Sequence, residues 1–247
     1  MSDIAYDAEY CYPNSNVLIN KFDIRDNETL SKAERKLTKI RQRQLQAKPI
    51  TGNFDLKHLQ NIHKHLFQDI YPFAGKLRNV DIAKGNSMFC VSHHVPTYAN
   101  GIFDKLKKEQ YLENTEPDKL SERLAHYLGE LNALHPFREG NGRTQREFIN
   151  ALARHNGYTI DFSKIPDGQM LNASIVSMQA ADNSRLQELI DTAISPVQES
   201  QEQTKPRSKP AKSKADTDYV NDAIYRLERN QEALENGQQD NPNSRYN

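Results

Sequence analysis

A stretch of twelve consecutive residues, 135–146, constrains this chain more than any other part of its sequence. It reads HPFREGNGRTQR, so an imidazole, a carboxylate, two glycines and two spaced arginines occur together. The apolar residues Phe148, Ile149 and Leu152 follow at helical spacing, which predicts a helix over about residues 141–156. The first amides of a helix have no partner within it, and the helix dipole attracts anions to them. A glycine-rich turn at such a helix start therefore predicts a phosphate site.

The glycines and arginines of this stretch suit a nucleotide. Gly140 and Gly142 allow positive φ and let the main chain come close to a ligand. Arg143 and Arg146 stand three residues apart, so on a helix they share one face. Two guanidinium groups in that arrangement could hold two phosphates of one nucleotide in forked geometry. We therefore expect a triphosphate at this helix start.

Glu139 and His135 supply the chemistry of the predicted site. A carboxylate beside a phosphate cradle suits Mg²⁺, which proteins usually hold through one or two carboxylates and phosphate oxygens. An imidazole, with an ordinary pKa of about 6.5, is a usable general base at neutral pH, and such a base typically contributes roughly 10²–10⁴-fold in rate. Taken singly, His-Pro and Gly-Asn-Gly are common turn and loop sequences. Their joint occurrence at one helix start indicates a catalytic site.

Composition narrows the classes of protein to which this chain can belong. Its 247 residues suffice for one domain of ordinary size with further segments. Lysine plus arginine and aspartate plus glutamate both total 33, so no net charge favours nucleic acid or a membrane surface. No apolar run is long enough to span a bilayer, and no signal-peptide pattern begins the sequence. The two cysteines, Cys11 and Cys90, favour reduced thiols in a cytoplasm, while secretion by a signal-independent route stays open.

Apolar residues recur at helical spacing along most of the chain, so the expected fold is mostly α. The strongest pattern covers residues 117–134, where leucines form one apolar stripe. Pro117 suits the first turn of this helix, Thr115 is its expected cap, and its end delivers the chain to His135. Further helices are predicted over residues 27–47, 55–68, 98–111, 168–181 and 183–194.

Residues 78–91 show a different pattern. Residues 78–83 alternate like a short strand, residues 84–87 form a turn and residues 88–91 form a second strand, which together predict a β-hairpin. An isolated hairpin is only marginally stable in water, so we expect this one to pack on the helices.

The composition changes after residue 194. Residues 196–215 are rich in Gln, Ser, Pro and Lys and carry almost no apolar side chains, which predicts a disordered basic linker. A helical pattern returns over residues 216–236 and is followed by Gly237, which favours a helix end. The chain is therefore divided into a catalytic domain of residues 1–195, the linker, and a C-terminal helical tail of residues 216–247.

The residues described above resemble a known family. Residues 135–146 match every fixed position of the motif of the Fic (filamentation induced by cAMP) family, HPFx[D/E]GNGRxxR. The resemblance covers most of residues 8–165 and implies a Fic-type helical bundle with the hairpin as a flap over the active site. It is strongest to the subgroup of bacterial Fic toxins and effectors. Its further matches are Tyr12-Pro13, Gly52-x-Phe54-Asp55, Ile62-His63-x-x-Leu66-Phe67, Tyr71-x-Phe73-Ala74-Gly75, Arg78 and Lys84-x-x-Ser87-x-Phe89.

The resemblance implies a role for each matching residue of the site. His135 would deprotonate the target hydroxyl, Phe137 would anchor the loop in the core, and Glu139 would hold Mg²⁺. A target protein would add a strand to the flap, residues 78–91, and so bring its hydroxyl near His135. The nucleotide ATP would be bound by residues of the hairpin, the loop and the helix start, namely Lys84, Ser87, Arg138, Gly140, Asn141, Gly142, Arg143 and Arg146.

The implied activity is the transfer of AMP from ATP to a Ser, Thr or Tyr hydroxyl of a target protein, with release of pyrophosphate. Kinase-like Doc relatives carry lysine at the position of Gly142, so the glycine here favours adenylylation over phosphorylation. Two alternatives stay open. In the first, the chain is a catalytically silent binding module with a Fic-type fold. In the second, it transfers a group from another nucleotide donor, such as UTP, GTP or a CDP-alcohol.

Inhibition is a further implication of the resemblance. Many Fic enzymes carry a helix with the pattern [S/T]xxxE[G/N], whose glutamate pairs with the second motif arginine, here Arg146. No Glu-Gly or Glu-Asn pair of this chain satisfies the pattern, neither Glu113-Asn114 nor Glu139-Gly140 nor Glu235-Asn236. We therefore expect the inhibitory helix on a separate small antitoxin chain. Self-inhibition through Glu235 of the terminal helix is the weaker alternative.

Histidines outside the motif do not form a metal-binding pattern. His63 with His65, and His93 with His94, are close in sequence, but the chain contains no HExxH and no CxxC. Structural or surface roles are therefore favoured for them. A GxxxxGK[ST] phosphate loop is also missing from the sequence, so an ordinary P-loop nucleotidase is not supported.

Overall fold

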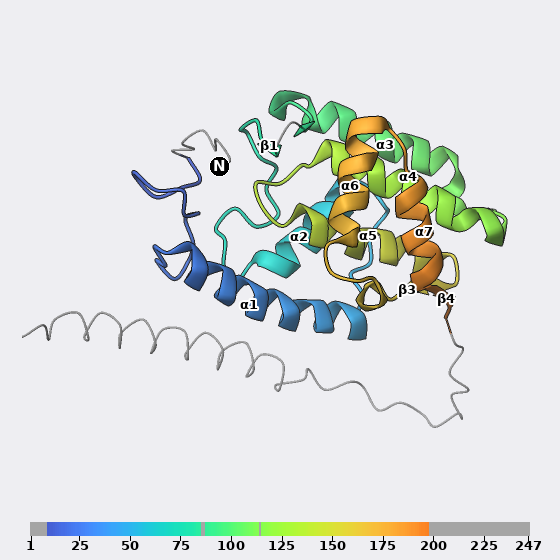
Figure 1. Ribbon diagram of the computed structural model, residues 1–247, viewed down its shortest axis with the longest axis horizontal. Coiled ribbons are helices and arrows are strands. Elements are labelled where there is room, and N and C mark those ends of the chain that lie inside the picture. The colour runs from blue at the N-terminus through green and yellow to red at the C-terminus, as the bar shows by residue number, and fades with distance from the viewer. Residues whose placement is uncertain (1–8, 85–86, 114, 198–247) are drawn as a thin grey trace, which may run out of the picture.

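The computed structural model describes residues 9–84, 87–113 and 115–197, and this part of the chain is mostly helical, as predicted (Figure 1). Short 3₁₀ turns cover Ser92–His94, Gln110–Leu112 and Phe162–Lys164. Each helix predicted within these residues is present, with ends close to the predicted ones. The helices are α1 (Asn27–Ala47), α2 (Leu56–Phe67), α3 (Val95–Lys108), α4 (Pro117–Leu134), α5 (Asn141–His155), α6 (Gln169–Ala180) and α7 (Ser184–Ala193).

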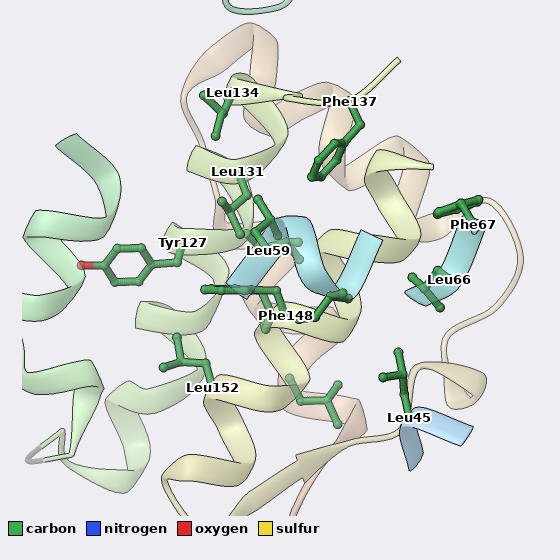
Figure 2. Close-up of a cluster of buried hydrophobic side chains, with 14 of the residues drawn as sticks. Leu45, Leu59, Leu66, Phe67, Tyr127, Leu131, Leu134, Phe137, Phe148 and Leu152 are labelled. Carbon is green, nitrogen blue, oxygen red and sulfur yellow. The ribbon is translucent and has the colours of Figure 1, made fainter. Parts of the chain in front are cut away.

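Helix α4 lies at the centre of the bundle. It contacts α3, α5, α6 and α7, and α5 also packs on α2. The predicted apolar stripe of α4 is buried, and Figure 2 shows Leu131 of α4 in one cluster with Leu59 of α2 and Phe148 of α5. Burying a side chain of this size stabilises the fold by about 1.5–3 kcal/mol relative to leaving it exposed. Helices α2, α4 and α5 therefore form the frame that positions the motif.

The N-termini of the helices follow local signals, with one correction. Asp26 and Asp55 cap α1 and α2 through their carboxylates, and each cap of this kind contributes about 1 kcal/mol. Pro117 begins α4, as predicted, but the predicted cap Thr115 is wrong. Glu116 occupies the N-cap position and makes no capping hydrogen bond with its side chain. The fixed φ of proline is sufficient to start this helix.

The predicted hairpin is present but shorter than expected. Strand β1 (Ala83–Lys84) pairs antiparallel with strand β2 (Ser87–Met88), and Ala83 lies opposite Met88. Residues 78–82 and 89–91, which were predicted as strand, lie outside both strands.

The reason is that several main-chain groups beside the hairpin form hydrogen bonds elsewhere. The carbonyls of Val80 and Cys90 accept hydrogen bonds from the guanidinium of Arg78. The Cys90 amide donates to the carbonyl of Ala133 on α4 at 3.0 Å. The hairpin is thereby attached to the end of α4, which confirms that it packs on the helices.

A second pair of short strands was not expected. Strand β3 (Tyr158–Ile160) pairs antiparallel with strand β4 (Ile194–Pro196). The Val197 amide continues the contact by donating to the Gly157 carbonyl at 2.8 Å. The ordered pairing therefore extends two residues past the predicted domain end at 195. The predicted linker from 198 onward, and the predicted helical tail with Glu235, lie outside the described residues.

Two further sequence expectations concern the described part of the chain. Both Cys11 and Cys90 are free thiols. Among the helices of the described residues, none combines the length and the apolar character needed to cross a bilayer.

Two helical glycines give a matched test of the packing around α4. A Cβ added at Gly129 would overlap Oδ1 of Asn183, the N-cap of α7, and would approach Oγ of Ser177 in α6 to 2.9 Å. The Ser177 hydroxyl donates a hydrogen bond to that Asn183 oxygen. Gly129→Ala should therefore destabilise the protein by about 1–2 kcal/mol. Gly101 on α3 has open space at its Cβ position, so Gly101→Ala should stabilise by roughly 0.5–1 kcal/mol. Urea denaturation measures both. Equal shifts for the two variants, or a Gly129→Ala protein as stable as the wild type, would contradict the close approach of α4 to α6 and α7.

Candidate active site

The C-terminus of α4 presents the histidine of the motif. His135 caps α4 in the left-handed conformation (φ 44°, ψ 60°), and its amide donates to the Leu131 carbonyl. A residue with a Cβ adopts this conformation at a cost of order 1–3 kcal/mol, so surrounding contacts must hold it. The conformation ends the helix abruptly and turns the chain into the motif loop, residues 135–140.

The imidazole of His135 has a defined tautomer and surroundings. Its Nδ1 lies 3.2 Å from the Asn132 carbonyl, and because a carbonyl only accepts, Nδ1 carries the hydrogen in the neutral ring. Nε2 is then the nitrogen that can accept a proton. The ring stacks on Phe89, with ring centroids 3.7 Å apart. Burial above all, and also the positive charges of Arg78 and Lys84, lower the pKa of His135 to about 4. The side chain is therefore neutral and ready to act as a base at pH 7.

The motif loop is closed by the side chain of Asn141. Its Oδ1 accepts from the Phe137 amide at 2.9 Å, and its Nδ2 donates to the Phe137 carbonyl at 2.6 Å. Both residues are buried, and Figure 2 shows the Phe137 ring within the hydrophobic cluster. Because these bonds use the side chain of Asn141, only its main-chain amide is left to meet a phosphate.

His63 of α2 holds the motif loop by a hydrogen bond. Its Nδ1 accepts from the Gly75 amide at 2.7 Å, so Nε2 carries the hydrogen and donates to the Glu139 carbonyl at 2.9 Å. The ring stacks on Phe137 with centroids 3.9 Å apart. Burial lowers the pKa of His63 to about 4, which keeps this two-sided bonding intact at neutral pH. The structural role favoured for His63 is confirmed, and its contact with the loop could not be read from local spacing.

Helix α5 begins with open amides, as the sequence predicts. Within the described residues, the amides of Asn141, Gly142 and Arg143 have no hydrogen-bond acceptor. Gly140, at the N-cap, adopts φ 78°, and an added Cβ would overlap the ring of Phe67. The expectation of positive φ is wrong for Gly142, which is the second residue of α5 and is exposed. Gly142 instead leaves the helix start uncovered, so an anion can approach the amides closely.

Arg143 is held by a residue that the sequence analysis missed. Its Nη2 donates to Glu34 Oε1 of α1 at 2.5 Å, and its guanidinium lies 4.7 Å from the centroid of the Phe67 ring. Tyr71 donates its hydroxyl to the other oxygen of Glu34. Burial, followed by the charge of Glu34, raises the pKa of Tyr71. Glu34 stands 109 residues from Arg143 in sequence. Its one local signal is that it lies on α1 beside the apolar face.

Arg146 differs from Arg143 in having no such support. It is half-buried, and within the described residues it forms no hydrogen bond or ion pair. Burial is the main cause that lowers the pKa of its guanidinium, and the nearby charge of Arg143 adds to this. A guanidinium in this setting attracts an anion strongly. A Cβ placed on Gly142 would lie 3.5 Å from Arg146 Nη1, so this group borders the start of α5.

Glu139 lies at the edge of the same helix start. Its Oε1 accepts from the Gly140 amide at 2.9 Å and lies 3.6 Å from Arg143 Nη2. The side chain is 44% exposed, so its other oxygen can reach a ligand in solvent. The described residues contain no group of three metal-binding side chains. A single carboxylate is compatible with Mg²⁺, which in nucleotide sites is bound largely by phosphate oxygens and water.

Three further residues predicted to bind nucleotide lie around this centre. The guanidinium of Arg138 contacts the N-terminal segment, with Nη2 3.9 Å from Cys11 Sγ and the group 6.0 Å from the centroid of Tyr10. Lys84 is exposed on β1, close enough to His135 to lower the pKa of that imidazole. Ser87 lies in β2, paired with Lys84.

Comparison with known proteins shows the family of this chain. Residues 53–153 match the family model described as Fic/DOC family. The protein adenylyltransferase VbhT of Bartonella schoenbuchensis is 46% identical over 168 residues, which make up 68% of this chain and 35% of VbhT. The probable protein adenylyltransferase Fic of Escherichia coli is 36% identical over 192 residues, which make up 78% of this chain and 94% of that protein. The match thus spans about a third of VbhT and nearly all of the E. coli protein.

Solved structures with the same fold carry nucleotides. The N-terminal Fic domain of a putative cell filamentation protein from Bartonella quintana, solved with bound ADP, is 28% identical. Its TM-score is 0.73, and the likeness covers 77% of this chain and 96% of that one. BepC of Bartonella tribocorum, solved with bound AMPPNP, is 25% identical with a TM-score of 0.71 over 76% of this chain and 97% of that one. By sequence and by fold, this chain belongs to the Fic/DOC family, and its relatives are nucleotidyltransferases named protein adenylyltransferases.

Proposed function

We propose that this chain transfers AMP from ATP to a Ser, Thr or Tyr hydroxyl of a target protein and releases pyrophosphate. The observation that carries the proposal is that two kinds of free group stand at the two ends of the motif loop, residues 135–140. His135, whose Nε2 can accept a proton, follows the last residue of α4, and the open amides of residues 141–143 begin α5. Relatives of similar length are named protein adenylyltransferases, and structural neighbours hold ADP or an ATP analogue.

The phosphates of ATP belong at the start of α5. The open amides and the helix dipole would receive them, Arg143 would present a guanidinium fixed by Glu34, and Arg146 would contribute a second one. Glu139 would hold Mg²⁺, which when bound neutralises charge on the phosphate oxygens. Reactions of this type depend on positioning and on charge neutralisation rather than on covalent chemistry by the protein.

The transfer itself needs one base. The target hydroxyl oxygen attacks the α-phosphorus, and the bond from that phosphorus to the oxygen that bridges to pyrophosphate breaks. The hydroxyl proton goes to Nε2 of His135, which is the unprotonated nitrogen. Because burial and nearby positive charge disfavour the protonated imidazole, His135 then returns this proton readily to solvent.

The target segment belongs at the flap, residues 78–91. Within the described residues the sheet of β1 and β2 has only these two strands, so a segment in extended conformation can add at its edge. Met88 of β2 is 67% exposed and supplies an apolar contact next to Phe89, whose ring lies on His135. A hydroxyl carried by such a segment would reach the imidazole from the flap side.

Replacing His135 tests the role of the base. His135→Ala should reduce label transfer from labelled ATP to proteins of a bacterial lysate by roughly 10²–10⁴-fold, because the proton acceptor is lost. His126→Ala is the matched control, since His126 is a half-buried histidine on the same helix. The fold of both variants is checked by circular dichroism. Equal labelling by His135→Ala and the wild type would remove His135 from this role.

We also propose that inhibition comes from a separate antitoxin chain. Within the described residues Arg146 forms no ion pair, so it can receive a carboxylate from another chain. None of the Glu-Gly or Glu-Asn pairs of this chain fits the inhibitory pattern. Ending the chain after residue 197 removes Glu235 and keeps the β3–β4 pairing. Automodification by this shortened chain should equal that of the full chain. A clear rise on truncation would instead make the tail the inhibitor.

A further inference from the structure

Arg78 is a buried cation that makes no ion-pair contact with a carboxylate within the described residues, although the charge of Asp81 acts on it. It is 2% exposed, and within the described part of the chain its guanidinium hydrogen-bonds only to main-chain carbonyls. Burying a charge is costly when no opposite charge is in contact with it, and an apolar side chain of similar size would avoid that cost. The arrangement therefore calls for a reason other than stability, and the positions of the four carbonyls supply one.

Part of the guanidinium contacts the segment that carries the base. Nε donates to the His135 carbonyl at 2.8 Å, and Nη2 lies 3.5 Å from the Leu134 carbonyl. The Arg78 amide donates to the Pro136 carbonyl at 2.9 Å. One residue thus contacts three consecutive carbonyls around the left-handed His135. Two of these carbonyls lie at the C-terminus of α4, where the helix dipole favours a cation.

The rest of the guanidinium contacts the flap. Nη1 donates to the Val80 carbonyl at 2.7 Å, before β1, and Nη2 donates to the Cys90 carbonyl, after β2. Both sides of the hairpin are therefore attached to the same rigid group. Only the planar, five-donor guanidinium can reach two segments in this way, because an ammonium group lacks the fork.

From this geometry we propose that Arg78 is a positioning residue that fixes the flap, and with it the target segment, relative to the imidazole of His135. The proposal rests on the function proposed above. Phe89, between β2 and Cys90, stacks on His135, so a shift of the flap would also move the ring against which the base is held. A displacement of about 1 Å at a reacting centre can cost 10²-fold in rate.

Arg78 has a second effect on the same imidazole. The charged groups that act on His135 are Arg78 and Lys84, and both lower its pKa, while the bond to the Asn132 carbonyl raises it. Removing the charge of Arg78 should therefore raise the pKa of His135 from about 4 towards the ordinary value of a histidine. A base with a higher pKa is protonated at higher pH, so the acid limb of the rate profile should move to higher pH.

Two substitutions separate geometry from charge. Arg78→Lys keeps the charge and loses the fork, whereas Arg78→Gln loses the charge and keeps a shorter donor. Three quantities are measured: the pKa of His135 by NMR of ¹³C-labelled histidine, the affinity for ATP with Mg²⁺ by calorimetry, and label transfer to lysate proteins at saturating ATP. Arg123→Gln is the control, because Arg123 is a partly exposed arginine of α4 paired with Glu109.

Both Arg78 variants should lose about 10²-fold in label transfer while the affinity for ATP stays within twofold of the wild type. The pKa of His135 should rise in Arg78→Gln and stay low in Arg78→Lys. The control Arg123→Gln should change none of these quantities. A merely structural role would reduce the yield of folded protein without moving the pKa of the folded fraction.

The outcomes distinguish this proposal from the proposed function. A folded Arg78→Gln with the pKa of His135 and the label transfer of the wild type would overturn the proposal. If Arg78→Gln does not fold, Arg78→Lys decides, and wild-type transfer by that variant would overturn it. If the wild type itself labels no protein, the proposed function fails, whereas the pKa comparison still tests the effect of Arg78 on His135.

Discussion

The arrangement of the site depends on the short connection between α4 and α5. Two left-handed residues, His135 and Gly140, bracket this loop, and only the second is a glycine. Asn141 closes the loop by bonding to both main-chain groups of Phe137, and His63 holds it from α2 through the Glu139 carbonyl. These bonds bring the end of one helix to the start of the next. As a result, a proton acceptor and an anion site stand at the two ends of one short loop.

Three arginines around this loop have three different environments. Arg143 is paired with Glu34 and stacked on Phe67, so it is fixed before any ligand arrives. Arg146 forms no hydrogen bond or ion pair within the described residues, so its charge is open to a ligand. Arg78 is satisfied by carbonyls of the flap and of the α4 end. The same side-chain type therefore serves to present charge, to receive an anion and to position the base.

Much of the fold could be predicted because helical periodicity is a local property of the sequence. The helices of the described residues and the start of α5 at Asn141 follow from spacing alone. Strands β3 and β4 could not be predicted, since each has only three residues and its partner lies far along the chain. For the same reason the hairpin was predicted too long, because the alternation of residues 78–83 does not reveal that Arg78 takes the neighbouring carbonyls.

The site, too, combines residues that a local pattern reveals with residues that it does not. The motif marks His135, Glu139 and the arginines, because these residues are close in sequence. Their supports come from elsewhere, since Glu34 lies on α1 and His63 on α2. No local pattern joins residues so far apart. The position of a residue in the helical repeat shows only that its polar side chain lies near the apolar face.

A crystal structure of this protein with ATP and Mg²⁺ tests the central claim most directly. The account predicts that the phosphates lie on the amides of residues 141–143, with Arg146 bonded to a phosphate oxygen. It also predicts that the α-phosphorus faces Nε2 of His135 from the side of the flap. A nucleotide bound elsewhere in well-occupied density, with the start of α5 free of phosphate, would contradict it.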